Sequence, residues 1–261
     1  MKKKIKKTLM IFILFFISLT SFKTYSAQKN YLMVFAPASL KDSLNEVLLL
    51  YKNEKSIEIK EVYLGTAQLA QQIKNGAEPD FFISANMEWM HHLEQRALVL
   101  KNYTYVLLSN SLVAITNNEN YNKMKHDSFR SIKETFLNTN TRISLAMVDA
   151  VPAGIYAKEY FKNIGIWNKI KKNVANSPNV RSALSFVSRG DLEYGVVYKS
   201  DALVDNRVKI IYELDPALYT KVEYPITILN NKNDTLHLYN FLMKDKVLSI
   251  FRKWGFIVTH D

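Results

Sequence analysis

Four positions in the sequence put a small or hydroxyl-bearing residue where a predicted strand gives way to a helix. Ser39 and Thr66 stand at such junctions early in the chain, and Ala153 and Val180 stand at two later ones. The first turn of a helix has N–H groups without an intrahelical partner and a partial positive charge, so several helix openings together can bind an anion. The spacing leaves a second interpretation open, in which each residue only caps its own helix. Ser39 with Asp42 three residues later fits that capping pattern.

Other patterns that carry chemistry are not found in the sequence. It has no Cys, which excludes a thiol nucleophile and a thiolate zinc site, and it has no HExxH, GxSxG, P-loop or GxGxxG motif. The adjacent His91 and His92 diverge by about 100° around a helix, so they do not form a metal-ligand pair. Catalytic constellations are therefore scarce in this sequence, and it indicates no cofactor. The five histidines, which we interpret as surface or structural residues, are His91, His92, His126, His237 and His260.

The N-terminus has the pattern of a secretory signal peptide. Five lysines between positions 2 and 7 precede an apolar run over residues 9–17, and the small residues Ser26 and Ala27 follow. We predict a signal peptide over residues 1–27 and a periplasmic location. An uncleaved membrane anchor is the alternative, although the run is shorter than the ~20 apolar residues that span a bilayer. No Cys follows the run, so we expect no lipid tether.

The net charge of the 261-residue chain is +11, but the predicted leader contains six of the lysines and no acid. Removing these six charges leaves +5 over the remaining residues, where basic and acidic side chains are interspersed. This ordinary value gives no support for a nucleic-acid partner. Hydrophobic residues make up 48% of the chain, with only seven Gly and six Pro, which excludes a disordered or fibrous protein.

The mature chain alternates predicted strands and helices, which is typical of a mainly parallel α/β sheet. Its length suits two domains. The helix that starts at Ser39 has buried positions at Leu40, Leu44, Val47, Leu48 and Tyr51, and the polar stretch 117–127 predicts a surface loop. The predicted strands cover 31–35, 57–64, 81–83, 111–116, 142–146, 195–198, 208–212 and 224–229. The predicted helices cover 67–75, 87–95, 154–164, 181–189, 234–243 and 246–254.

Several motifs resemble those of the molybdate-binding periplasmic proteins of ABC importers, in the same order along the chain. The most specific is VPAGIYAKE at 151–159; the others are VFAPASLKDSL at 34–44, Gly65-Thr66, DFFISA at 80–85, Val180-Arg181, GVVY at 195–198 and KVEYP at 221–225. The resemblance covers essentially the whole mature chain.

This resemblance implies the two-lobed type II periplasmic binding protein fold, an α/β fold with mixed sheets flanked by helices and two crossovers. Lobe 1 would comprise residues 28–107 plus 223–261, and lobe 2 residues 108–222. The implied ligand is molybdate or tungstate, held in the interlobe cleft through its oxygens, without protein ligands to the metal. The implied donors are the hydroxyls and N–H groups of Ser39 and Thr66, the N–H groups of Ala153 and Val180, and the Tyr198 hydroxyl.

Thr66 stands where the family often has a serine, and its methyl group could trim the cavity. Arg181 is the one cation near these positions, and we expect it on the helix surface or behind the donors.

The resemblance implies a monomeric solute-binding subunit that delivers the oxyanion to a membrane permease driven by an ATPase. Two alternatives stay open. The first is a binder of another oxyanion, such as sulfate, phosphate or a phosphonate, on the same scaffold. The second is an envelope enzyme or a sensor domain on this fold, against which stands the missing pair of base and nucleophile.

Overall fold

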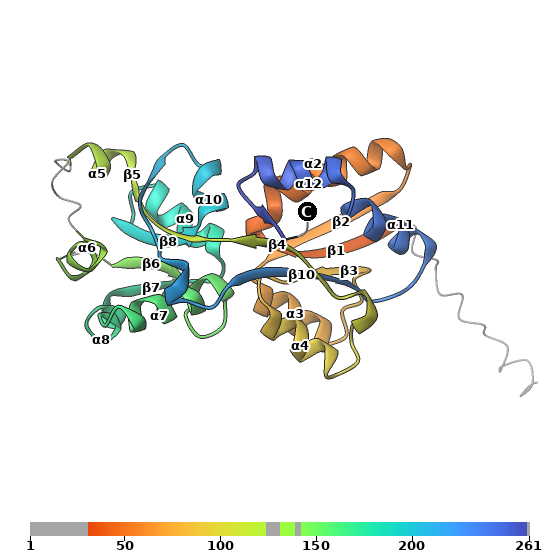
Figure 1. Cartoon of the computed structure of the whole chain (residues 1–261), viewed down its shortest axis with the longest axis horizontal. Coiled ribbons are helices and arrows are strands. Elements are labelled where there is room, and N and C mark those ends of the chain that lie inside the picture. Colours follow the sequence, from red (N-terminus) through yellow and green to blue (C-terminus); the bar gives the residue numbers. More distant parts are fainter. Residues whose placement is uncertain (1–30, 124–130, 139–141, 260–261) are drawn as a thin grey trace, which may run out of the picture. The chain divides into compact units, whose positions relative to one another are not determined.

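A computed structural model describes residues 31–123, 131–138 and 142–259, which fold as two β-sheets flanked by helices (Figure 1). The predicted signal peptide, His126 and His260 lie outside the described residues. No helix of the described part combines the length and the apolar character needed to cross a membrane.

The first sheet has six strands in the order β11-β4-β10-β3-β1-β2. Strand β1 pairs in parallel with β2 and β3, whereas β10 is antiparallel to β3 and β4, and β11 is antiparallel to β4. These strands are β1 (Tyr31–Pro37), β2 (Glu58–Leu64), β3 (Phe81–Ile83), β4 (Tyr105–Asn110), β10 (Val222–Ile228) and β11 (Ile257–Val258).

The second sheet has five strands in the order β7-β6-β8-β5-β9. Strand β6 is parallel to β7 and β8, and β5 is antiparallel to β8 and β9. These strands are β5 (Leu112–Asn117), β6 (Ile143–Ala146), β7 (Val174–Ser177), β8 (Tyr194–Tyr198) and β9 (Val208–Glu213).

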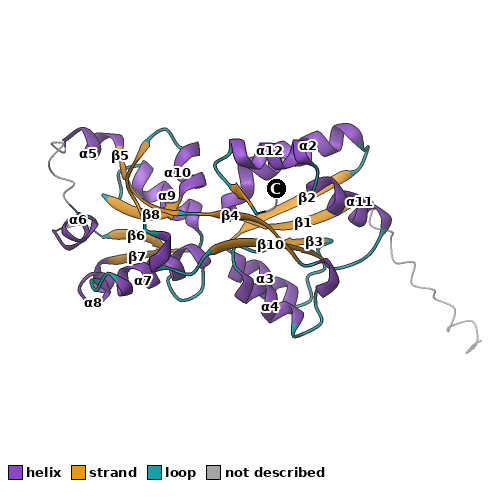
Figure 2. Cartoon of the chain, in the orientation of Figure 1, coloured by secondary structure: helices purple, strands orange, loops and turns teal. Residues whose placement is uncertain are grey.

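Helices cover both faces of each sheet (Figure 2). Those of the first sheet are α2 (Lys41–Glu54), α3 (Thr66–Lys74), α4 (Met87–Glu94), α11 (Asn233–Leu242) and α12 (Asp245–Lys253). Those of the second part are α5 (Asn118–Lys123), α6 (Ile132–Asn138), α7 (Pro152–Asn163), α8 (Trp167–Ile170), α9 (Val180–Ser188) and α10 (Lys199–Val204). Short 3₁₀ turns cover Ala38–Leu40, Lys101–Tyr103, Lys171–Asn173 and Pro216–Leu218.

Strand β1 shows how the first sheet is covered on both faces. Its side chains alternate, so that Leu32, Val34 and Ala36 join the core under α2 and α12, while Phe35 packs with Leu69 and other residues of α3 and α4. A strand buried on both faces reads as a continuous apolar run, which is why YLMVFAP is apolar throughout. The five predicted core positions of the helix after Ser39 are all buried.

The expectation of a mainly parallel sheet, drawn from the strand and helix alternation alone, was wrong, and the mixed sheets implied by the resemblance are confirmed. The reason is that β5, β10 and β11 run antiparallel to the strands beside them. The predicted loop over 117–127 was wrong in part, because residues 118–123 form α5. The structure also contains strands β4, β7 and β11, which the sequence patterns did not indicate.

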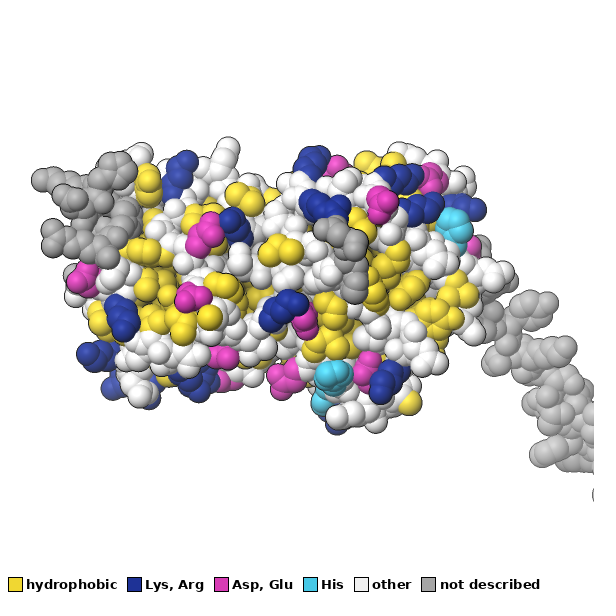
Figure 3. Space-filling view, in the orientation of Figure 1, with side chains coloured by type: hydrophobic (Ala, Val, Ile, Leu, Met, Phe, Trp, Pro, Cys, Tyr) yellow, Lys and Arg dark blue, Asp and Glu magenta, His cyan; other side chains and the backbone are white. Residues whose placement is uncertain are grey.

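The chain passes from the first sheet to the second at Ser111, between β4 and β5, and returns between β9 and β10. The described residues from 31 to 259 form one compact unit by their contacts. The lobe boundaries at 107/108 and 222/223 therefore stay a prediction. On the face drawn in Figure 3, basic and acidic side chains are interspersed.

Candidate functional site

All five residues singled out in the sequence line one small cavity. Ser39 and Thr66 follow strands of the first sheet. Ala153, Val180 and Tyr198 follow or end strands of the second sheet. The volume open to the centre of a water-sized sphere is about 10 Å³, which is room for roughly one small group. No Asp, Glu, Lys, Arg or His is among the described residues that line it. The cavity is therefore small and has no formal charge on its walls.

Backbone N–H groups supply one set of donors. Thr66 and Val180 are the first residues of α3 and α9, and Ala153 is the second residue of α7. No helical acceptor exists for an N–H at these positions. Within the described residues, none of the three N–H groups has a backbone partner outside its helix either. Three N–H donors from three helices are thus available at this cavity.

The Thr66 hydroxyl supplies another donor. Its Oγ1 accepts a hydrogen bond of 3.1 Å from the backbone N–H of Ala85, a residue that also lines the cavity. A hydroxyl that accepts through its oxygen keeps its own hydrogen to donate. Because Thr66 is only 1% exposed and lines the cavity, this hydrogen has little access to bulk water and is available to a group bound in the cavity.

Ser39 lies in the 3₁₀ turn before α2 and does not cap that helix through its side chain, so the capping interpretation is wrong for this residue. The Ser39 hydroxyl lies 3.0 Å from the hydroxyl of Tyr224 instead. Tyr224 comes from β10 and is fully buried. The serine side chain is therefore committed to a tertiary contact at the edge of the cavity rather than to its own helix.

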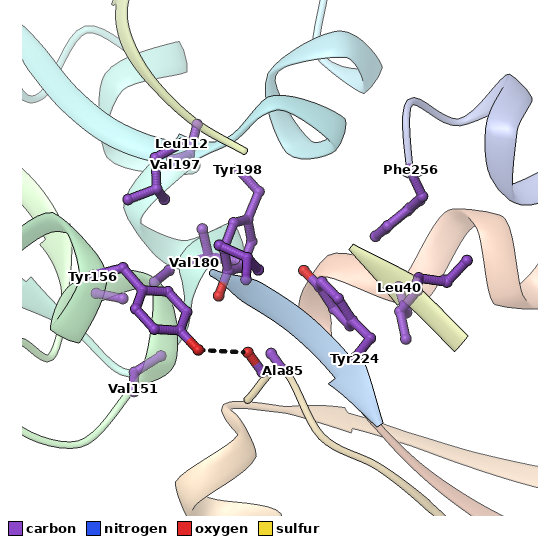
Figure 4. Packing of buried hydrophobic residues seen from close by; sticks show 14 of the residues in the cluster. Leu40, Ala85, Leu112, Val151, Tyr156, Val180, Val197, Tyr198, Tyr224 and Phe256 are labelled. Carbon is purple, nitrogen blue, oxygen red and sulfur yellow. Dashed lines mark hydrogen bonds between the residues drawn. The ribbon is translucent and has the colours of Figure 1, made fainter. Parts of the chain in front are cut away.

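Tyr198 ends strand β8, and its side chain is 1% exposed. Its hydroxyl has no hydrogen-bond partner among the described residues, although it is buried. Burial, with a smaller effect of Tyr224, raises the pKa of the Tyr198 hydroxyl well above its ordinary value, so it stays protonated. Figure 4 shows the hydroxyl ends of Tyr156, Tyr198 and Tyr224 directed toward the same space. A buried, protonated and unpaired hydroxyl beside a cavity is a donor that lacks its acceptor.

Arg181 lies close to the cavity but does not line it. Its guanidinium forms ion pairs with Asp42 of α2, at 2.6 Å, and with the fully buried Asp201 of α10. Burial would lower the pKa of Arg181, but Asp201 and Asp42 together raise it, so the cation is retained. A donor group of Arg181 also reaches the carbonyl oxygen of Ser39, at 3.5 Å. Its charge is thus balanced by two carboxylates.

Two glycines are required where backbones meet closely at the site. A Cβ on Gly65, which lines the cavity, would lie 2.6 Å from the carbonyl oxygen of Pro178. A Cβ on Gly154 would lie 2.1 Å from the carbonyl oxygen of Ala146, which lets the first turn of α7 approach β6. These contacts bring the helix openings within reach of one another.

Side-chain hydrogen bonds also join the two sheets' parts of the chain beside the cavity. The Tyr156 hydroxyl donates to the Ala85 carbonyl at 3.4 Å, drawn as the dashed line in Figure 4, and the Trp89 indole donates to the Ala150 carbonyl at 3.1 Å.

A family profile described as bacterial extracellular solute-binding protein matches residues 32–257 of this chain. The chain belongs to this family of solute-binding proteins. Molybdate-binding protein ModA of Escherichia coli is 30% identical over 234 residues, which cover 89% of this chain and 91% of that protein. A putative ABC transporter substrate-binding lipoprotein, YvgL of Bacillus subtilis, is 30% identical over 89% of this chain and 88% of that protein.

Solved structures agree with the family's fold. The substrate-binding domain of a putative molybdenum ABC transporter from Clostridium difficile has a TM-score of 0.66 and 26% identity, covering 88% of this chain and 99% of that domain. The periplasmic molybdate-binding protein of Azotobacter vinelandii has a TM-score of 0.75 at 15% identity, over 88% of this chain and 100% of that one, and so shows the fold alone. The predicted two-lobed fold and family are confirmed.

Sequence patterns did not indicate the groups that hold the site residues of this solute-binding protein in place. Tyr224 stands in the middle of an apolar strand and gave no sign of contacting Ser39. Asp42 and Asp201 gave no sign of pairing with the same arginine. For Asp201 a signal existed, because a carboxylate three residues after GVVY, on a helix too short to stand alone, is unusual without a partner.

Proposed function

We propose that this solute-binding protein captures a fully deprotonated tetrahedral oxyanion in the cavity lined by Ser39, Thr66, Ala153, Val180 and Tyr198, with molybdate as the first candidate and tungstate as its close analogue. The protein would deliver the anion to the permease and ATPase of an ABC importer. It would act as a monomeric binder in the periplasm, exported by the N-terminal segment, and not as an enzyme. Support for molybdate comes from the relatives that carry this name at 30% identity over nearly the whole chain.

The Tyr198 hydroxyl is the observation that carries this proposal. Leaving a buried hydroxyl unpaired costs about 1–3 kcal/mol. An oxyanion in the cavity would supply the missing acceptor for Tyr198 and for the unpaired N–H groups around it. Charge-assisted hydrogen bonds of this kind are stronger than neutral ones, and together they replace the water that a buried dianion loses.

The described lining offers several N–H and O–H donors and no carboxylate, which favours anions that carry no proton. Molybdate, tungstate and sulfate offer only acceptor oxygens at neutral pH, so each can accept from every donor of the cavity. Phosphate keeps at least one O–H under these conditions, and the described lining has no carboxylate or imidazole to accept it. One unpaired O–H costs about 1–3 kcal/mol, which corresponds to a 5- to 150-fold penalty against phosphate.

Sulfate is the second candidate, because it has the same tetrahedral shape, the same charge and no proton at neutral pH.

Binding would be coupled to closure of two lobes, taken as residues 28–107 plus 223–261 and residues 108–222. The donors of the cavity come from both sheets, so one anion can satisfy all of them only while the two parts are together. A ligand that bridges both parts only in the closed state shifts the population toward it, and the permease can then recognise the closed shape.

Thermal unfolding with and without anions tests the proposal. The purified protein is heated with molybdate, tungstate, sulfate or phosphate, and calorimetric titration gives the affinities. An anion at 1,000 times its Kd stabilises the fold by about 4 kcal/mol, which is about 10 °C in Tm for a domain of this size. We expect this shift with molybdate and tungstate and not with phosphate. A shift with phosphate alone, or with none of the four anions, would overturn the proposal.

A further inference from the structure

A hydrogen-bonded network of polar side chains extends from Ser39, at the cavity, into the interior of the protein. The Ser39 and Tyr224 hydroxyls are 3.0 Å apart, and Asn110 lies behind Tyr224, with its Nδ2 at 3.5 Å from the tyrosine oxygen. The same Nδ2 donates to the Ser200 hydroxyl at 2.8 Å. These four residues are 0–6% exposed, so bulk water has little access to their polar atoms. This network links strand β10 through Tyr224, the end of β4 through Asn110 and the start of α10 through Ser200.

The orientation of the Asn110 amide is set by its other end. Its Oδ1 accepts a hydrogen bond of 2.9 Å from the backbone N–H of Ser111. A backbone N–H can only donate, so this contact requires the carbonyl oxygen there and turns the NH₂ group toward Tyr224 and Ser200. An NH₂ group has no acceptor to offer, and Tyr224 therefore cannot donate to Asn110.

This orientation decides which of the two hydroxyls donates in the Ser39 and Tyr224 pair. Among the described residues, the Ser39 oxygen is the one acceptor within hydrogen-bond distance of the Tyr224 hydroxyl. If Ser39 donated instead, the tyrosine hydrogen would be buried without an acceptor, at a cost that proteins avoid. Tyr224 therefore donates, Ser39 accepts, and the hydrogen of Ser39 is left to point into the cavity.

We propose that Tyr224, oriented by Asn110, is a positioning residue that fixes the Ser39 hydroxyl as a donor toward the bound anion. This inference rests on the proposed function and extends it to residues that do not line the cavity. Without the Tyr224 hydroxyl, Ser39 regains a free lone pair and can turn it toward the cavity. The Tyr224 hydroxyl then contributes both to affinity for a proton-free dianion and to discrimination against a protonated one.

A double-mutant cycle on the full chain tests the role of Tyr224. Calorimetric titration with molybdate, and in parallel with sulfate, is done for the wild type, Tyr224→Phe, Ser39→Ala and the double variant. We expect Tyr224→Phe to weaken binding about 3- to 30-fold in the wild-type background and less than twofold when Ser39 is already Ala, because contacting residues couple. Tyr156→Phe is the matched control, since its hydroxyl bonds to Ala85 and not to Ser39. Its effect should be the same in both backgrounds.

Two further readouts separate positioning from a purely structural role. Phosphate binding by Tyr224→Phe should improve relative to molybdate or sulfate, because Ser39 can now accept from the phosphate O–H. In the ligand-free protein, the Tyr224 hydroxyl proton should be a slowly exchanging NMR resonance with an Overhauser contact to the Ser39 β-protons. Equal effects of Tyr224→Phe in both backgrounds, or a hydroxyl proton that belongs to Ser39 rather than Tyr224, would overturn the inference. If the wild type bound neither anion, the proposed function would fail. The NMR measurement would still show whether Tyr224 donates to Ser39.

Discussion

Replacing Tyr198 by Phe removes a single oxygen and should separate binding from folding. The hydroxyl is buried, protonated and unpaired among the described residues, so in the proposed site its stabilising contact would be made with the ligand. A hydrogen bond to a charged group contributes about 1.5–3 kcal/mol, which predicts a 10- to 150-fold weaker affinity for the oxyanion. Calorimetric titration of both proteins with molybdate measures this loss.

The same substitution should not destabilise the ligand-free protein. A buried hydroxyl without a partner costs free energy in the folded state, so its removal is neutral or raises the free energy of unfolding by about 1 kcal/mol. Since 1 kcal/mol corresponds to about 2–4 °C in a domain of this size, the Tm of ligand-free Tyr198→Phe should equal the wild-type value or exceed it slightly.

Tyr219→Phe is the matched control for this experiment. Tyr219 is also a buried tyrosine of the second part of the chain, but its hydroxyl accepts a hydrogen bond of 3.0 Å from the backbone N–H of Leu112. Its removal leaves that N–H unpaired, so we expect a lower Tm and an unchanged affinity. If Tyr198→Phe instead lowered the ligand-free Tm and left the affinity intact, the assignment of Tyr198 as a ligand donor would be refuted.

Three more predictions follow from the contacts around the cavity. Gly65→Ala places a methyl group 2.6 Å from the carbonyl of Pro178, so titration should show at least tenfold weaker binding, with little change in the ligand-free circular dichroism spectrum. Asp42→Asn removes one carboxylate from Arg181 and leaves its charge less balanced; because this pair is partly exposed, phosphate affinity should rise only about two- to fivefold, and less at high salt. Sulfate affinity should be constant from pH 7 to 10, because the raised pKa of Tyr198 keeps the donor protonated until the pH rises well past 10, and a loss near pH 10 would contradict this.

Local patterns predicted most helices and the apolar strands, because amphipathic spacing and runs of apolar residues depend only on residues that are close together in the sequence. The five core positions from Leu40 to Tyr51 are an example. Strand direction is different: β4 pairs with β10, more than a hundred residues further along the chain, and no local pattern encodes that partner. The helix at 118–123 was missed for a related reason, since no residue of it is buried and its sequence NENYNK has no apolar face.

The candidate site was predictable to the extent that helix openings can be located from the sequence. Ser39, Thr66, Ala153 and Val180 could be named as openings, but their meeting at one cavity depends on the arrangement of two sheets. The direction of the Ser39 hydroxyl depends in turn on Tyr224, whose neighbour Pro225 shifts the register of β10 at this point. Such a contact comes from tertiary structure, and the apolar surroundings of Tyr224 in the sequence conceal it.

The position of Arg181 bears on how the site would select its ligand. A free cation at the cavity would attract any anion of the right size, protonated or not, because Coulomb attraction depends on charge and distance and not on hydrogen-bond donors or acceptors. Here two carboxylates, Asp42 and Asp201, already balance the guanidinium, and the cavity wall itself has no charged side chain among its described residues. What remains for the anion is a set of fixed N–H and O–H donors, each of which needs an acceptor. Selection by such a set depends on the number of acceptor oxygens and on cavity size, so releasing Arg181 from its acids should broaden the range of bound anions rather than tighten the binding of one.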